Sequence, residues 1–526
     1  MSDIKSLCKT IDLKNLAKRI FIVFVILQPL FDIYMSLFDE KISIMSTSLA
    51  TIVRLLMVFI MTLFIMIETR KKKFTLFFVL YLFAILVYTA IHHFNANGFS
   101  VKLAKAEYNL LGELLYIARM TIPAALIYVI YNIKLRYKDI KLMICSASGA
   151  ISSVIIISNL LKFGYVAYAL NKVTVSNNMI SWFTGSDVDW RLLTCRGLFQ
   201  RTNQISGLML IILPVLLHIC FKEKKIKFWI LPLLHIIAMI NLGTRIASVG
   251  GILVLSMMVF LYVIENIIYK ENFRKQAKNA MCFLFVAVFI TVIFFQSPII
   301  KRSSEGSLFG EIGIGGFDDM IDDDSEIDDD LDDDLDDDSE IGSEGNIEKK
   351  RYIKENYDQK GVHRLFIIEA YPYEQDIDFW YNLLKNVPSS EYYGNRNLRG
   401  FIIDRILERD GRFSNYLFGI SFTRSSSFIW PERDIETHFD ALGVIGVILF
   451  IGPYFACAII GIWFFFKRFK ENLKVSKCVY MIGLVLGLMV GYFSGHIINE
   501  VFPFVYLSLI AGVTLTNALN PELDEE

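Results

Sequence analysis

Uncharged apolar blocks of about 20 residues recur along this chain, and they restrict its fold more than any other feature. A helix of ~20 residues crosses the ~30 Å hydrocarbon core of a bilayer and satisfies its own backbone hydrogen bonds there. A membrane β-barrel would instead show alternating segments of ~10 residues, which the sequence lacks. Hydrophobic residues make up 54% of the chain, against ~45–50% in soluble domains. We therefore predict an all-α fold, a polytopic transmembrane helical bundle.

The apolar blocks predict about 12 spans. The blocks at 228–241 and 246–264 are separated by only a short turn, and the first of them is short. No small-x-small cleavage site follows the block at 20–38, which favours a retained span over a removed signal peptide. The predicted spans are 20–38, 46–67, 74–91, 109–131, 141–161, 204–221, 228–241, 246–264, 279–298, 439–466, 478–495 and 499–517.

Lysine and arginine are distributed unequally between alternate loops. They concentrate in one set, which includes 68–73, 132–140, 222–227 and 467–477, and are sparse in the short loops of the other set. Basic loops stay in the cytoplasm. The pattern predicts a multi-pass protein of the cell membrane whose N-terminus and C-terminus are both cytoplasmic.

Two loops on the opposite side are long, and they divide the chain into three parts. Residues 1–298 hold the first nine spans with an outer loop at 162–203, residues 299–438 form one large extracytoplasmic segment, and residues 439–526 hold the last three spans and a cytoplasmic tail. Within the large segment, 318–340 contains 16 acidic residues among 23 and no basic residue. Like charges at this density repel, so we expect a disordered, solvated tether. The run lacks the glycine-punctuated spacing of an EF-hand loop.

Cofactor-binding patterns do not occur. The seven cysteines include no CxxC pair, and neither a Walker A motif, GxGxxG nor HExxH is present. We therefore expect no cofactor, no metal centre and no nucleic-acid partner.

Three ionisable residues lie inside predicted spans: Arg54, Glu113 and Arg119. Charges in a bilayer are costly and often functional. Two interpretations remain open for them, internal pairing (Arg119 with Glu113 or another acid, and Arg54 snorkelling near a helix end) or the lining of a polar cavity.

Polar residues also gather where spans begin on the outer side. Residues 195–204 carry Arg196, Arg201 and Asn203 directly before a span, and Arg245 opens another span with no acid in its own turn. Arginine forks suit phosphate oxygens, and a helix N-terminus attracts anions. An interfacial loop with snorkelling arginines is the simpler interpretation.

Further candidates lie near the outer ends of later spans and in the large segment. Glu436 and His438 open the tenth span, and a histidine beside carboxylates can act as a general base near neutral pH. His496, with Glu500, forms a second such group. Arg405 would share a basic face with Arg409 and Arg412 if that stretch is helical; a solvated face is the simpler interpretation.

Taken in order, these segments resemble the O-antigen ligase and polysaccharide polymerase superfamily of bacterial membrane proteins. Members carry an RxxGxFxxxNxxA-like segment, matched here by residues 196–207 with the arginine adjacent to the glycine and Ser206 at the alanine position. They also carry an S/T-R-small turn, matched by 244–248, and an LFGxG…E/H…GxxG pattern, matched by 417–446. His438 stands five residues before Gly443, a spacing closer to that of the polymerases.

The resemblance implies metal-independent glycosyl transfer at the outer membrane face. Its implied partners are an undecaprenyl-diphosphate-linked glycan donor, a glycan or cell-envelope acceptor and membrane lipid. Arg196 and Arg245 would bind the diphosphate and His438 would be the catalytic base. The supporting substrate-binding residues would be Arg201, Asn203, Arg405, Glu436 and His496.

Other functions stay open at this level. A multi-span transporter or a lipid-linked oligosaccharide flippase would suit the buried charges, although no internal repeat of spans is visible. A sensor that detects cations through the acidic run is a third possibility. The sequence does not separate polymerase from ligase.

Overall fold

The computed structural model describes residues 12–38, 43–44, 47–101, 107–169, 172–184, 188–223, 226–269, 287–288, 290–305, 344–362, 364–389, 396–428 and 433–520. The acidic run at 318–340 lies outside these residues, as does most of the predicted span 279–298. The disorder expected for the acidic run therefore stays a prediction.

Long apolar helices dominate the described chain, which confirms the all-α polytopic bundle. Among the described residues, ten helical stretches are long and apolar enough to cross a membrane. They are α2 (Leu13–Phe38), α3 (Leu49–Thr69), α4 (Lys73–Asn97), α5 (Leu110–Ile133), α6 (Tyr137–Leu160), α8 (Thr202–Glu223), α10 (Arg245–Tyr269), the continuous pair α19 (Asp434–Phe450) and α20 (Gly452–Lys467), α22 (Val475–Phe493) and α23 (Val501–Leu519). The predicted span 228–241 appears as the shorter apolar helix α9 (Ile230–Asn241).

Short elements connect the spanning helices. Two two-residue strands, β1 (Ser43–Ile44) and β2 (Thr47–Ser48), pair antiparallel between α2 and α3. The others are α7 (Ser181–Thr184), η2 (Trp190–Leu193), η3 (Ile226–Trp229), α12 (Pro298–Glu305), α14 (Glu344–Asn356), the π-helical η6 (Leu365–Ala370), η7 (Tyr373–Gln375), α15 (Ile377–Asn386), α16 (Arg396–Asp410), α17 (Ser414–Phe418), α18 (Phe422–Phe428) and α21 (Phe469–Asn472).

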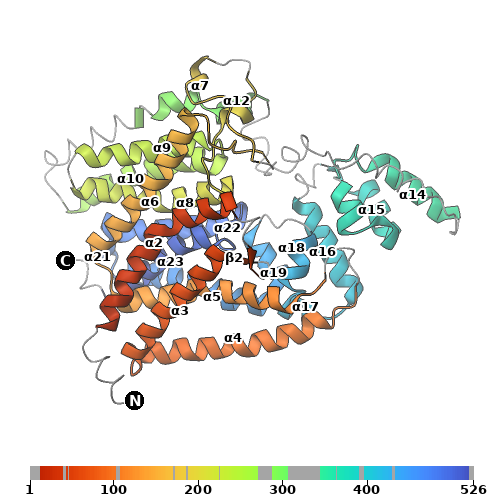
Figure 1. The fold of residues 1–526 in the computed structure, drawn as a ribbon, viewed down its shortest axis with the longest axis horizontal. Coiled ribbons are helices and arrows are strands. Elements are labelled where there is room, and N and C mark those ends of the chain that lie inside the picture. The colour runs from red at the N-terminus through yellow and green to blue at the C-terminus, as the bar shows by residue number, and fades with distance from the viewer. Residues whose placement is uncertain are drawn as a thin grey trace.

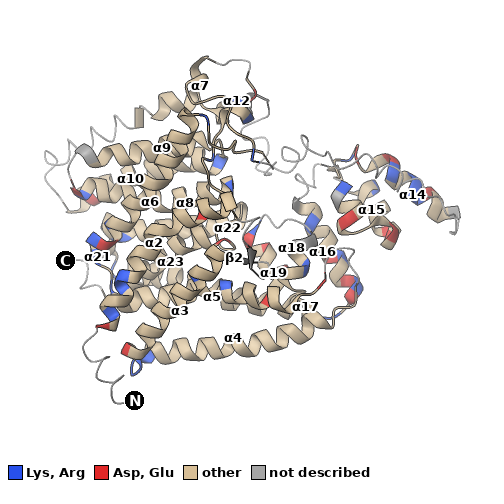
Figure 2. Cartoon of the chain, viewed as in Figure 1, with Lys and Arg blue, Asp and Glu red and all other residues tan. Residues whose placement is uncertain are grey.

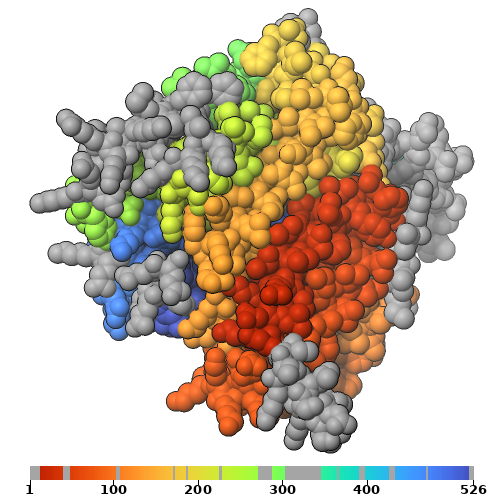
Figure 3. Space-filling model, turned by 60° about the vertical axis from the view of Figure 1, so that its left-hand side comes forward, coloured from red at the N-terminus to blue at the C-terminus, as the bar shows by residue number. Residues whose placement is uncertain are grey.

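The bundle has a buried centre and an apolar outer surface. The central helices are α8, which packs against α22, α10 and α23, and α23, which also packs against α5 and α20 (Figure 1). Nearly every residue of both is buried. On one face α2 lies beside α3 and α6 (Figure 3). Helices α2 and α3 expose large apolar side chains such as Leu30 and Phe59. An apolar surface of this kind is what lipid tails cover.

Charges lie mainly at the two ends of the bundle. Figure 2 shows them around α21 and the chain termini at one end and around α14–α16 at the other, with mostly uncharged helices between. This distribution fits helices that cross a bilayer.

The described residues between 344 and 407 form a small helical unit with its own core. Trp380 is fully buried there and donates a hydrogen bond from Nε1 to the Tyr371 carbonyl at 2.9 Å. The unit rests on the end of α4, because Phe99 joins its core; just beyond the unit, the last residue of α16, Asp410, accepts a hydrogen bond at Oδ1 from Ser100 N at 2.7 Å. The unit therefore stands at the end of the bundle where α4 ends (Figure 1).

Candidate functional site

The two arginine-bearing segments singled out from the sequence pack against each other. Cys195, next to Arg196, donates from its backbone N to the Asn241 carbonyl at 2.9 Å. Gly243 has φ +65°, and a Cβ there would lie 2.5 Å from the Thr194 side chain. The hydroxyl of Thr244, next to Arg245, donates to Ser206 at 2.8 Å. Arg196 and the N-terminus of α10 are thus held in one local structure.

Arg196 is a buried cation with spare hydrogen-bonding capacity. Its side chain is 8% exposed and its guanidinium lies over the Tyr165 ring. Nε is buried and has no hydrogen-bond partner among the described residues. Burial lowers the pKa of Arg196, although nearby Tyr165, Cys195 and Asp32 favour its charged form. A buried donor without a partner costs free energy, so it is suited to an anionic ligand.

Arg245 is the first residue of α10 and is half-buried. The helix start is capped, because Thr244 Oγ1 accepts a hydrogen bond from Ala247 N at 3.1 Å. Asn203 lies half-buried in the first turn of α8, between Thr202, which donates to the Ala167 carbonyl, and Gln204.

The segment before α8 also meets the loop between α22 and α23. Arg201 Nη1 lies 3.3 Å from Glu500 Oε1 and 3.3 Å from His496 Nδ1. Because a guanidinium only donates, Nδ1 accepts, and the neutral ring then carries its proton on Nε2. Burial raises the pKa of Glu500, but the positive charge of Arg201, followed by those of Arg119 and Arg54, outweighs it and leaves that pKa below its usual value. The carboxylate is therefore ionised, with arginines around it.

Asp434, at the start of α19, fixes this loop. Its buried carboxylate accepts hydrogen bonds from the backbone N of His496 at 2.8 Å, Ile497 at 2.8 Å and Ile498 at 2.7 Å. His496 has φ +61°, a left-handed conformation that costs a non-glycine residue free energy. The three bonds to one carboxylate offset that cost and hold His496 toward Arg201.

The inner faces of α2 and α3 support the same region. Asp32 accepts from Gln200 N at 3.1 Å and from Gln204 Nε2 at 3.2 Å. Arg54 is 1% exposed, donates from Nε to Gln28 at 2.9 Å and has a buried Nη2 without a partner among the described residues. Arg54 therefore does not snorkel to the helix end.

Arg119 and Glu113 do not pair with each other, which corrects one of the partners expected for the charged residues inside the spans. Glu113 binds His92 Nε2 at 3.0 Å and accepts from the backbone N of Phe422 and of Thr423. Arg119 instead lies over the rings of Tyr116 and Phe422, at 5.1 and 5.6 Å. Its Nε is buried and without a partner among the described residues.

Two glycines explain the third sequence pattern. Gly419 has φ +76°, and a Cβ there would lie 2.2 Å from the Ala441 carbonyl; Gly443 has φ +68°, and a Cβ there would lie 2.4 Å from Leu417. The two stretches bond side by side, through Ile420 N to the Asp440 carbonyl at 2.9 Å. Only glycine permits this approach of two backbones.

The side chains of His438 and Glu436, in the first turns of α19, point to different partners. His438 is fully buried; Nδ1 donates to the Asp434 carbonyl at 2.7 Å, and Nε2 lies 3.2 Å from Met120 Sδ. When the ring is neutral, Nε2 is the nitrogen that can accept a proton. Glu436 turns to Arg433, with 2.5 Å between Oε1 and Nη1. The structure does not place these two side chains together.

Arg405 lies apart, in the unit formed by residues 344–407. Its Nε donates to Asp376 at 2.7 Å, and Arg409 binds the Tyr371 hydroxyl, also at 2.7 Å. Arg412 lies beyond the end of α16 and binds Asp410. The three arginines therefore do not form one solvated helical face.

The sequence interpretation missed Asp32 and Asp434. Asp32 could have been found from the sequence, because it is an acidic residue inside the predicted span 20–38. Nothing in the local sequence distinguishes Asp434 from its acidic neighbours. No cluster of three or more His, Cys, Asp or Glu side chains suited to a metal ion occurs within the described ranges.

Comparison with known proteins identifies a family. A family model described as O-antigen ligase like membrane protein matches residues 14–520, nearly the whole chain. No curated protein and no solved structure matches.

Proposed function

Because the chain belongs to the family of O-antigen ligase-like membrane proteins, we propose that it moves a glycan from an undecaprenyl-diphosphate carrier to a hydroxyl group of a glycan or cell-envelope acceptor. Family membership indicates a multi-pass membrane protein with a polysaccharide-related ligase activity. The lipid-diphosphate donor and the cell-surface product are the proposal.

One observation carries this proposal: the segments with Arg196, Arg201 and Arg245 pack together where α8 and α10 begin. In the reaction, an acceptor oxygen bonds to the anomeric carbon while the bond from that carbon to the diphosphate oxygen breaks. The diphosphate leaves with the electron pair and gains negative charge. Arginines aimed at that charge stabilise the transition state, and Arg196 has an unused buried donor for this purpose.

The acceptor hydroxyl must lose a proton, and two groups are proposed for this role. His438 offers an unprotonated Nε2, which becomes available when the Met120 side chain moves aside. Glu500 is an ionised carboxylate beside Arg201. The pH–rate profiles of His438→Ala and Glu500→Gln separate them, since loss of the true base removes the acidic limb of the profile.

Arg245 gives the most direct test. Lysine keeps the positive charge but cannot make a bidentate contact with two phosphate oxygens. We therefore expect Arg245→Lys to accumulate normally in the membrane and to transfer glycan more slowly by a factor on the order of 10²–10³. The assay uses purified protein, undecaprenyl-diphosphate oligosaccharide and acceptor, with surface glycan length measured in cells. Lys71→Arg, an exposed change at the turn between α3 and α4, is the matched control. Wild-type rates for both Arg245→Lys and Arg245→Ala would remove Arg245 from the site and contradict the proposal.

A further inference from the structure

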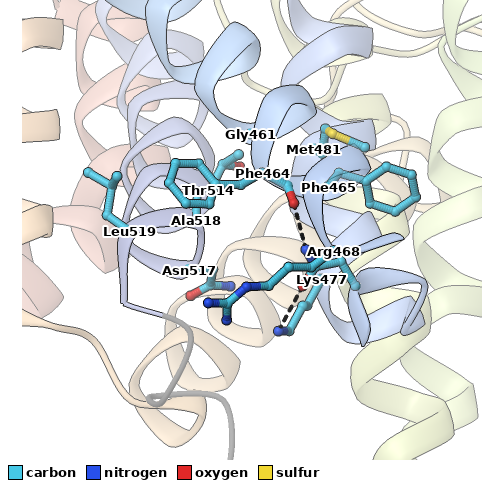
Figure 4. A pocket seen from close by; sticks show the side chains of 11 residues that line it. Gly461, Phe464, Phe465, Arg468, Lys477, Met481, Thr514, Asn517, Ala518 and Leu519 are labelled. Carbon is cyan, nitrogen blue, oxygen red and sulfur yellow. Dashed lines mark hydrogen bonds between the residues drawn. The ribbon is translucent and has the colours of Figure 1, made fainter. Parts of the chain in front are cut away.

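A cavity of about 200 Å³ lies at the opposite end of the bundle from residues 344–407, between the ends of α20, α22 and α23 (Figure 4). Its walls include Phe464, Phe465 and Met481, and polar side chains such as Asn517 stand at its edge. Neither the arginine segments nor the loop that holds His496 reaches it. The cavity is therefore separate from the site proposed above.

Two cations face this cavity from different helices. Arg468 follows α20, and its exposed guanidinium makes no hydrogen bond or ion pair with any residue that the structure describes. Lys477, in α22, donates to Asn472 Oδ1 at 3.2 Å, and Asn472 Nδ2 donates to the Phe464 carbonyl at 2.7 Å. None of the described lining residues is acidic. The turn between α20 and α22 thus presents positive charge beside an apolar slot.

The cavity suits an amphiphile whose polar part is small and anionic. About 200 Å³ is below the ~300–1,000 Å³ of sites that enclose drug-sized ligands, so a headgroup fits and a glycan does not. Trp463 and Phe466, at 66% and 68% exposed, mark the neighbouring surface of α20 as one that lipid tails cover. Basic pockets between spanning helices are known places for anionic headgroups. We propose that this cavity binds the phosphate headgroup of an anionic phospholipid, with the acyl chains along Phe464 and Phe465.

The test measures thermal unfolding of the full-length protein in detergent during titration with short-chain phosphatidylglycerol. We expect phosphatidylglycerol to raise Tm, while phosphatidylcholine at equal concentration does not. A double variant, Arg468→Gln with Lys477→Gln, should need about 30-fold more lipid, because each basic side chain near an anionic surface contributes a factor of about five. Lys71→Gln removes a cation from the exposed turn between α3 and α4 and should titrate as the wild type does.

A second variant keeps both charges and fills the slot. Ala518 lines the cavity, so Ala518→Phe should abolish the rise of Tm with phosphatidylglycerol. If either variant has too low a Tm for this titration, native mass spectrometry measures the loss of bound lipid directly. An unchanged titration in both variants would overturn the proposal. So would an equal response to inorganic phosphate, which would assign the site to a free anion. If phosphatidylglycerol raised Tm only for a shortened chain that ends at Asn520, the cavity of the full-length protein would instead be assigned to the carboxylates of residues 521–526. That result would also overturn the proposal.

Discussion

Arg201 and Glu500 meet just before the first turns of α8 and α23, with 3.3 Å between Nη1 and Oε1. These helices form the buried centre of the bundle, so the ion pair joins its two central elements at the end that carries the proposed site. We expect Arg201→Glu and Glu500→Arg each to destabilise the protein by about 1–3 kcal/mol, between the values for exposed and buried pairs. The exchanged double variant should regain its abundance but not its activity, because a cation displaced by ~1 Å can cost about 10²-fold in rate. Abundance and glycan transfer are measured in parallel, and full activity of the exchanged pair would reduce Arg201 to a structural role.

Asp434 should contribute more to stability than an exposed acid. In Asp434→Asn one carboxylate oxygen becomes an amide that faces a backbone N–H, and bonds to a charged acceptor contribute about 1.5–3 kcal/mol each. We expect the free energy of unfolding to fall by on the order of 3 kcal/mol, which is measured as a lower Tm. Hydrogen exchange at Ile497 and Ile498 should become faster. Asp378→Asn, at an exposed acid of α15, is the control. Equal Tm values for the two variants would show that the loop does not depend on Asp434.

The paired glycines should tolerate no side chain. At Gly419 or Gly443 alanine meets backbone atoms at 2.2–2.4 Å and must also adopt a positive φ, so each substitution should prevent accumulation of folded protein. A Cβ added at Gly400, in α16, would have no neighbouring atom within 4 Å, and Gly400→Ala should stabilise by about 0.4–1 kcal/mol. Fluorescence size-exclusion chromatography distinguishes these outcomes. Normal accumulation of Gly419→Ala would mean that residues 417–421 can move away from α19.

Acid should loosen the contact between the end of α4 and the end of α16. Burial raises the pKa of Asp410, but hydrogen bonds from Ser100, Arg412 and Asn415 outweigh it and lower that pKa from 3.8 to about 2. A depressed pKa stabilises the fold above the unfolded value, and this stabilisation disappears as pH falls from about 4 to about 2. Hydrogen exchange over residues 396–418, corrected for its intrinsic rate, should increase across that interval. In Asp410→Asn, hydrogen exchange over these residues should be fast at both ends of that pH interval. If the variant still responded to pH, another titrating group would be responsible.

The loop charges predict that residues 299–438 lie outside the cell. Ser389 is exposed, so Ser389→Cys should react with a membrane-impermeant thiol reagent in intact cells. Cys195, Cys220, Cys457 and Cys478 are buried, and the unmodified chain serves as the background control. Reaction only after lysis would invert the predicted topology.

The sequence by itself determined the helices and the family. Hydropathy over ~20 residues is a local property, and a helix that satisfies its own backbone in a bilayer needs no distant partner. Eleven of the predicted spans therefore coincide with helices, including the shorter α9. The order of three short motifs was enough for the resemblance that the family match confirms. Glycines 419 and 443 were visible as parts of a pattern, although not as the two sides of one backbone contact.

The tertiary structure decided which charges meet. Arg54, Glu113 and Arg119 were recognisable as costly charges inside spans, yet Glu113 joins His92 and Arg119 lies over aromatic rings. Arg405, expected near the substrate, binds Asp376 in a separate unit. Partners such as Asp434 and the loop before α23 come together only when α19 packs beside α22. That packing depends on the shapes of whole helix faces rather than on the residues adjacent to each charge, so no local pattern in the sequence encodes it.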